Sequence, residues 1–117
     1  KDRGQKIMVL AGIDLAHVGR RFGDEFDIDA EWKKKIEKED RDSLVNALKL
    51  NADDFFMSGI GQGSWRKVCG LSALYTSLRW IKSLNGGKNI EGNLLAYDQA
   101  DDPAGGVVSF TSAVFKS

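Results

Sequence analysis

One apolar run near the start of the chain places the strongest limit on its fold. Residues 7–11 are all apolar, and the run lies between Lys6 and Asp14. A strand with one face in water alternates apolar and polar residues, whereas this run contains no polar position. The run therefore predicts a strand that is buried on both faces, as in a parallel sheet with neighbouring strands on either side.

Helical signals dominate the middle of the chain. Asp29 is the predicted N-cap of a first helix, and Asp40 or Asp42 is expected to start a second one. A short helix is predicted to begin after Asn51. A longer helix is predicted over residues 70–84, where apolar residues recur at helical spacing.

Two strands are predicted at the end of the chain. Residues 93–100 and 107–115 alternate in side-chain type, and the turn-forming residues 101–106 separate them, so we expect an antiparallel pair. In the first of these strands the alternation puts Leu95 on the same face as Tyr97 and Gln99. Together with the apolar run and the helices, this order predicts an α/β fold, a layered αβα domain with a mixed sheet.

The composition excludes several classes of protein. The 117 residues suffice for a single domain, and 17 basic residues balance 17 acidic ones. A net charge of zero argues against a dedicated nucleic-acid binder, and no apolar run approaches the roughly 20 residues that cross a bilayer. A single cysteine permits no internal disulfide, which suits the cytoplasm. We therefore expect a cytoplasmic domain with neither a nucleic-acid nor a membrane partner.

The chain holds few residues that bind metals or act as nucleophiles. It has one histidine, His17, and one cysteine, Cys69. Because a zinc site built of these residue types needs three or four ligands, a metal site here must recruit carboxylates or another chain. Asp14 and His17 begin a predicted loop over residues 14–24, just after the predicted strand, and ligands of open α/β sheets bind at that end of the strands.

The neighbours of these residues suggest further roles. Arg20 and Arg21 are candidate ligands for an anion or substrate, or partners for the carboxylate of Asp14. Cys69 follows two cations and precedes a predicted helix, and both features favour a thiolate that binds metal or attacks carbon. Two structural alternatives stay open: Asp14 caps local backbone amides, and Cys69 is a small buried hydrophobe. A nucleophilic set of Cys69, His17 and Asp14 also stays open.

Three segments carry a more specific pattern. Residues 12–24 contain the motif Asp-x-x-His-x-Gly-x-Arg-Phe, residues 68–76 contain a Cys-Gly pair, and residues 94–100 and 107–110 are the predicted terminal strand pair. Each of them resembles a segment of the Memo family, also called AmmeMemoRadiSam system protein B. The segments occur in the family's order and cover nearly the whole chain.

The resemblance implies a fold related to the class III extradiol non-haem iron dioxygenases. Residues 1–117 would form the C-terminal portion of such a domain, with the N-terminal half absent. It implies a cleft in which Asp14, His17 and Cys69 are metal ligands or catalytic groups, beside two histidines from the N-terminal half. Without those histidines the chain is expected to bind iron or copper weakly and to be inactive alone. The implied partner is the upstream half of the same protein or a second copy of this chain.

The resemblance also implies a function. It points to metal binding and redox-related, oxidoreductase-like chemistry in the intact protein. One alternative is a non-catalytic module that uses the cleft for a peptide or a small anion, with Arg20 and Arg21 as contacts. Another is a thiol-dependent enzyme. The metal-site interpretation requires the Cys69 sulfur within about 12 Å of His17 or Asp14, since metal–ligand bonds are roughly 2.0–2.3 Å long.

Overall fold

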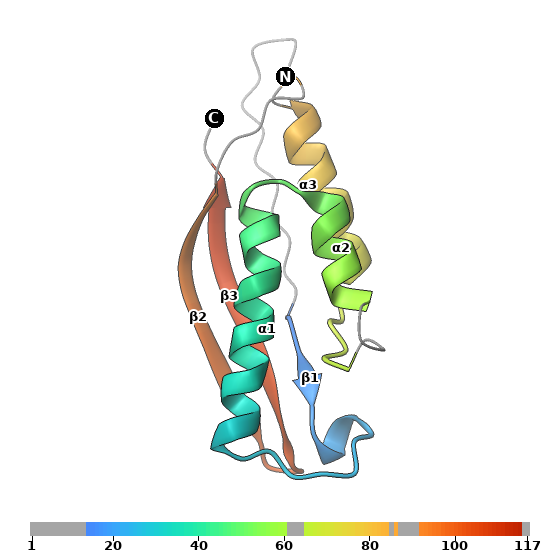
Figure 1. The fold of residues 1–117 in the computed structure, drawn as a ribbon, viewed down its shortest axis with the longest axis vertical. Coiled ribbons are helices and arrows are strands. Elements are labelled where there is room, and N and C mark those ends of the chain that lie inside the picture. The colour runs from blue at the N-terminus through green and yellow to red at the C-terminus, as the bar shows by residue number, and fades with distance from the viewer. Residues whose placement is uncertain (1–13, 61–64, 85, 87–91, 116–117) are drawn as a thin grey trace.

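A computed structural model describes residues 14–60, 65–84, 86 and 92–115. The described elements are β1 (His17–Val18), the 3-10 helix η1 (Arg20–Phe22), α1 (Ala30–Leu48), α2 (Ala52–Ile60), α3 (Leu71–Leu84), β2 (Gly92–Asp102) and β3 (Gly106–Phe115). Helices and a sheet are combined, so the predicted α/β class is confirmed (Figure 1). The strand predicted over residues 7–11 lies outside the described residues.

The described sheet is antiparallel and has the strand order β1-β3-β2. The predicted pair at the end of the chain is confirmed, because β2 pairs antiparallel with β3 from Gly92 opposite Phe115 to Asp102 opposite Gly106. The main-chain carbonyl of Asp102 accepts a hydrogen bond from Gly105 N at 2.9 Å, which closes the turn. A mixed sheet would need the predicted parallel strand, and that strand is not among the described residues.

A register shift in β2 overturns the predicted faces of this strand. The pairing skips one residue between Leu94 and Ala96, as in a β-bulge. Because a bulge inserts one residue into the alternation, the side chains before and after it change faces. Leu95 is therefore 64 % exposed, whereas Tyr97 and Gln99 lie on the face that contacts α1. The prediction that Leu95 shares their face is wrong.

The middle of the chain contains one long helix where two were predicted. The carboxylate of Asp29 accepts a hydrogen bond from Trp32 N at 2.9 Å, so the predicted N-cap is confirmed. The helix then continues to Leu48 without a second start at Asp40 or Asp42. No glycine or proline interrupts this stretch, and an Asp can remain inside a helix when its side chain finds a partner elsewhere. The starts predicted for α2 and α3 are confirmed.

The region predicted as a loop contains β1 and η1. His17 pairs with Val108 and Val18 with Val107, which adds β1 to the free edge of β3. Gly19 makes this possible, because a Cβ at that position would lie 2.3 Å from the Cα of Gly106. Gly19 also has a φ of +124°, which side-chain-bearing residues rarely adopt. The loop prediction for residues 14–24 is therefore wrong over β1 and η1.

The helices form a layer on one face of the sheet. Helix α1 packs on β2, β3 and α2, and α2 packs on α3 (Figure 1). Two apolar clusters result. One lies between the end of α1, the start of α2 and the middle of α3, and contains Ala47, Leu50, Ala52, Phe55 and Leu78. The other lies between β1, α1 and β3, and contains Ala16, Val18, Ile36 and Val107. The second cluster anchors the strand that carries His17.

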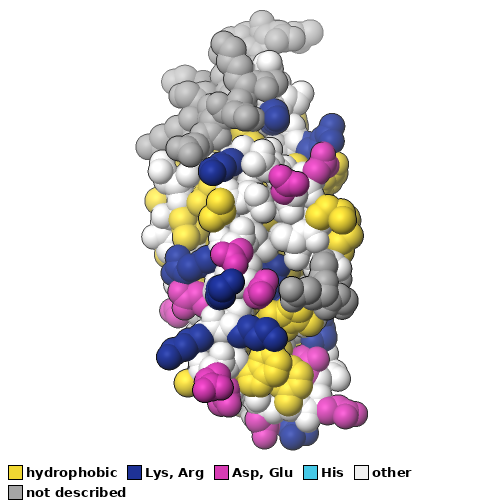
Figure 2. Space-filling view, viewed as in Figure 1, with side chains coloured by type: hydrophobic (Ala, Val, Ile, Leu, Met, Phe, Trp, Pro, Cys, Tyr) yellow, Lys and Arg dark blue, Asp and Glu magenta, His cyan; other side chains and the backbone are white. Residues whose placement is uncertain are grey.

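The solvent-exposed face of the molecule carries mixed charges. Figure 2 shows basic and acidic side chains interspersed on the face that includes α1. Lys33 pairs with Asp101 at 2.8 Å and Arg41 with Glu37 at 2.7 Å. Basic and acidic side chains therefore pair with one another on this face. Among the described residues, no helix is both long and apolar enough to cross a membrane.

Candidate functional site at the β1 edge

The structure brings Asp14, His17 and Cys69 together at the edge formed by β1. Nε2 of His17 lies 3.8 Å from Oδ2 of Asp14. The thiol of Cys69, in the segment just before α3, lies 3.6 Å from the main-chain oxygen of Asp14. The predicted proximity of these residues is therefore confirmed, although the chain forms two helices between His17 and Cys69.

The three side chains differ in their access to solvent. The side chain of Asp14 is 53 % exposed and that of His17 is 19 % exposed. Cys69 is a free, exposed cysteine. The alternative that Cys69 is packed as a small buried hydrophobe is wrong, and its sulfur is available to a ligand or reagent. This edge therefore combines an accessible thiol and carboxylate with a largely covered imidazole.

The imidazole of His17 has a defined orientation. Its Nδ1 lies 3.2 Å from the main-chain oxygens of both Leu15 and Lys67. A carbonyl oxygen only accepts hydrogen bonds, so these two contacts are hydrogen bonds in the tautomer that carries the proton on Nδ1. In the neutral imidazole this leaves the lone pair on Nε2, the nitrogen that faces Asp14. The ring of Phe22 meets the imidazole edge-on at 5.2 Å between centroids and limits its rotation.

The structure pairs Arg20 and Arg21 with carboxylates other than Asp14. Nε of Arg20 donates to Oδ1 of Asp27 at 2.6 Å. Nε of Arg21 lies 3.2 Å from Oδ2 of Asp102, the last residue of β2. Both arginines thus connect η1 to carboxylates of other segments. A role as anion ligands stays a prediction, and it would require an incoming anion to compete with these carboxylates.

The described residues supply suitable donor types for a metal but too few of them. Thiolate and imidazole suit iron and copper, and a carboxylate is a common third ligand. However, no group of three or more His, Cys, Asp and Glu side chains within the described ranges is arranged to hold a metal ion. Cys69 meets the main-chain oxygen of Asp14, while the carboxylate of Asp14 faces His17. The described part of the chain therefore does not fit a complete metal site.

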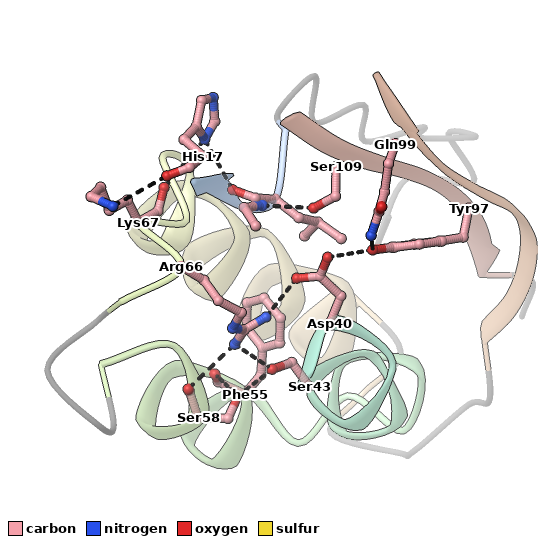
Figure 3. A network of polar contacts seen from close by, with 12 residues as sticks. His17, Asp40, Ser43, Phe55, Ser58, Arg66, Lys67, Tyr97, Gln99 and Ser109 are labelled. Atoms are coloured by element: carbon pink, nitrogen blue, oxygen red, sulfur yellow. Dashed lines mark hydrogen bonds and ion pairs between the residues drawn. The ribbon is translucent and has the colours of Figure 1, made fainter. Parts of the chain in front are cut away.

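A buried ionic network lies directly behind this edge, and sequence reasoning missed it. Arg66 and Asp40 are both buried, and Nη1 of Arg66 donates to Oδ1 of Asp40 at 2.7 Å. Nη2 of Arg66 donates to Oγ of Ser43 at 2.8 Å, and the hydroxyl of Tyr97 donates to Oδ2 of Asp40 at 2.6 Å. Figure 3 shows the guanidinium of Arg66 between α1 and α2, where it also approaches Ser58.

A sequence signal for this network was present. Asp40 lies four residues after Ile36 and four before Leu44, and both neighbours are buried on the inner face of α1. A charge at this spacing within an apolar stripe needs a partner of opposite charge. The sequence pattern could thus have identified Asp40 as buried, but it could not identify Arg66 as the partner.

The pKa of Tyr97 is shifted by its position in the network. Burial, and then the hydrogen bond to Asp40, raise the pKa of Tyr97 above its usual range. Both causes favour the neutral phenol, because the anion would lose hydration and face a carboxylate. Tyr97 therefore serves as a hydrogen-bond donor to Asp40 over the ordinary pH range. Gln99 in turn donates to the Tyr97 hydroxyl at 3.0 Å.

Residues 65–67 connect the buried network to the exposed edge. The main-chain oxygen of Arg66 accepts a hydrogen bond from His17 N at 2.7 Å. The side chain of the same residue is held by Asp40 and Ser43. The position of β1 relative to the segment that carries Cys69 is therefore set by a residue anchored in the core.

Comparison with known proteins identifies the family to which this chain belongs. The model of the Memo-like protein family matches residues 1–114. No curated protein and no solved structure matches the chain. The match includes both segments that form the edge site, the one with Asp14 and His17 and the one with Cys69. The chain therefore belongs to the Memo-like protein family.

Proposed function

We propose that this chain contributes one side of a metal-binding, redox-related site, with iron or copper as the metal. Cys69 and His17 would supply a thiolate sulfur and the Nε2 nitrogen, and Asp14 would bind or orient the ligand set. These donors suit iron and copper, which would supply one-electron redox chemistry to an oxidoreductase-like reaction. A cytoplasmic setting suits the proposal, because a free thiol persists in reducing compartments.

One observation carries the proposal: the fold brings three reactive side chains to one exposed edge. Asp14 and His17 come from one end of the described chain, and Cys69 comes from the other side of helices α1 and α2. The thiol lies 3.6 Å from Asp14 O, and Nε2 of His17 lies 3.8 Å from the Asp14 carboxylate. In the tautomer with the proton on Nδ1, Nε2 carries the lone pair that can bind a metal ion.

Further ligands are needed to complete the proposed site. A catalytic metal site takes about three protein ligands, and the described residues do not arrange three around one point. We propose that the missing ligands come from the upstream half of the same protein or from a second copy of this chain. Under this proposal the chain alone binds the metal weakly.

The alternative of a peptide- or anion-binding module receives less support. Its expected contacts, Arg20 and Arg21, are each paired with a carboxylate of the chain. An anion that binds the remaining N–H groups of either arginine would lie beside the carboxylate of Asp27 or Asp102 and be repelled by it. The metal-site proposal meets no such repulsion, because a metal cation is attracted to the exposed Cys69 thiol and Asp14 carboxylate.

Metal titration tests the proposed function. The purified chain is titrated under anaerobic conditions with iron(II) or copper(I) against a competing chelator. We expect weak binding that falls by about tenfold or more in Cys69→Ser and in His17→Gln, the scale seen when one member of a metal site is lost. Asp42→Asn is the matched control, because Asp42 lies on α1 and pairs with Lys38.

Two results would contradict the proposal. One is an affinity that Cys69→Ser and His17→Gln leave unchanged. The other is stoichiometric metal retained by both variants through dialysis against the chelator. Stoichiometric metal retained by the unaltered chain alone would overturn only the need for ligands from another chain.

A further inference from the structure

We infer that Lys67 is a positioning residue that fixes which nitrogen of His17 is available at the edge site. Its main-chain oxygen lies 3.2 Å from Nδ1 of His17 and shares the Nδ1–H hydrogen bond with the main-chain oxygen of Leu15, also at 3.2 Å. The neutral ring therefore presents its Nε2 lone pair toward Asp14. The inference rests on the proposed function in one respect only, namely that Nε2 is the atom that binds the metal ion.

The backbone of Lys67 has an unusual conformation for its residue type. Its φ is +49°, in the left-handed region, and Leu50 is the other non-glycine residue with a positive φ in the described part of the chain. Such a conformation is unfavourable for a residue with a side chain, because its Cβ lies too close to the following carbonyl oxygen. It persists only where surrounding contacts determine it, and strain of this kind gathers at functional sites.

The side chain of Lys67 supplies those contacts. Its ammonium donates to Oδ2 of Asp24 at 2.6 Å and approaches the main-chain oxygens of His17 and Trp65 at 3.4 and 3.3 Å. Asp24 is itself held by Gly19 N, which donates to the same oxygen at 2.9 Å. The ammonium therefore ties the strained turn to Asp24, which follows β1, and to the main chain of His17, the contact drawn in Figure 3.

The preceding residue fixes the other side of the turn. Arg66 accepts the His17 N–H through its main-chain oxygen at 2.7 Å, while its side chain is anchored on Asp40 in the core. His17 is thus held at its backbone by Arg66 and at its ring by the main-chain oxygens of Lys67 and Leu15. The contact of Arg66 with His17 N is enough to hold the two segments together. The contact of Lys67 with Nδ1 has a further effect, because it helps to determine which ring nitrogen carries the proton.

The tautomer of His17 can be measured without ambiguity. His17 is the single histidine of the chain, so every imidazole signal belongs to it. Long-range proton–nitrogen NMR on the ¹⁵N-labelled, metal-free protein distinguishes the Nδ1–H from the Nε2–H form at about pH 9, where imidazoles are neutral. We expect the Nδ1–H form to predominate in the folded chain. A peptide of residues 14–20, measured in parallel, supplies the reference without Lys67.

Two variants test the part played by Lys67. Lys67→Met removes the ammonium and keeps an unbranched stem, and Asp24→Asn removes its partner while keeping an acceptor for Gly19. In each variant the ratio of Nδ1–H to Nε2–H should fall about two- to tenfold, which corresponds to the net value of one hydrogen bond. Lys34→Met is the matched control, because Lys34 is exposed on α1 and should leave the ratio unchanged.

The outcomes separate this inference from the proposed function. A predominant Nε2–H form in the unaltered chain overturns the inference, even if a variant fails to fold. An unchanged ratio in both Lys67→Met and Asp24→Asn also overturns it. The NMR measurement uses metal-free protein, so it is independent of metal binding. If the Nδ1–H form predominates but the metal affinity is the same in Cys69→Ser and His17→Gln as in the unaltered chain, the inference stands and the proposed function is refuted.

Discussion

Two polar clusters lie on opposite sides of residues 65–67, and they are built on opposite principles. Behind this segment, Arg66 and Asp40 are buried and paired with each other. Arg66 also donates a short hydrogen bond to Ser43, and Asp40 accepts one from Tyr97. At the β1 edge, by contrast, the contacts of the Cys69 thiol and the Asp14 carboxylate are 3.6 and 3.8 Å long, and both groups are exposed.

The difference shows which cluster holds the fold and which is free to react. A buried charge is costly unless it is paired and hydrogen-bonded, so the contacts of Asp40 and Arg66 are needed for a folded chain. Exposed groups with long contacts add little to stability, and their lone pairs and sulfur remain open to a ligand. The predictions below test this division, beginning with the change expected to have the largest effect.

Removing one partner of the buried pair should be the most damaging change. Asp40→Ala leaves the guanidinium of Arg66 buried without its carboxylate, so we expect a loss of about 3–5 kcal/mol in the free energy of unfolding. Urea denaturation of the two proteins measures this loss. Asp42→Ala, which removes an exposed carboxylate of the same helix, should change stability little. A loss for Asp40→Ala as small as that of the control would contradict the division.

Replacing both partners should be less damaging than removing one. In the double variant Asp40→Leu with Arg66→Met, apolar side chains fill the space and no charge is left buried alone. We expect this variant to be more stable than Asp40→Ala, because the desolvation cost of both ions disappears with them. A double-mutant cycle by urea denaturation gives the coupling between the two positions. Losses that simply add would show that the two charges are not energetically linked.

Loss of the Tyr97 hydroxyl should have an intermediate and pH-dependent effect. Tyr97→Phe leaves Oδ2 of Asp40 without this donor, and we expect a loss of about 1–3 kcal/mol near neutral pH. The raised pKa of Tyr97 predicts a second effect. An unfolded tyrosine ionises near its ordinary value of about 10 while the folded one stays neutral, so stability should fall as the pH rises above that value.

The same variant supplies the control for the alkaline effect. Tyr97→Phe cannot ionise at this position, so its stability should fall less steeply above about pH 10 than that of the unaltered chain. Thermal or urea unfolding at a series of alkaline pH values measures both slopes. Equal slopes would mean that Tyr97 is not the group responsible.

Substitution at the exposed edge should have the smallest effect on stability. Cys69→Ser changes an exposed side chain with one long contact, and we expect a change within about 0.5 kcal/mol. In the unaltered, folded chain the thiol should react with an alkylating reagent without prior unfolding, since it is exposed. Mass spectrometry of the native chain measures this reaction. A thiol that reacts only in urea, or a large loss of stability in Cys69→Ser, would place this cysteine with the buried cluster instead.

Local patterns in the sequence predicted much of the secondary structure. The N-cap at Asp29, the helix over residues 70–84 and the strand pair at the end of the chain depend on neighbours within a few residues, and all three are confirmed. The continuity of α1 through Asp40 was missed, because an aspartate that starts a helix and one that is buried within it look alike locally. The bulge at Leu95 was missed for a similar reason, since it is a property of two paired strands.

The sequence by itself determined which residue types the site contains, and the tertiary structure decided how they are placed. His17 and Cys69 could be identified as candidate site residues from the sequence, because they are its single histidine and its single cysteine. Their proximity depends on β1 pairing with β3 and on Arg66 joining α1 to the segment before α3. One of the two main-chain oxygens that meet Nδ1 of His17 belongs to the neighbouring Leu15, and the other belongs to Lys67, fifty residues away in sequence. Such contacts are set by packing between distant segments, which local propensity does not encode.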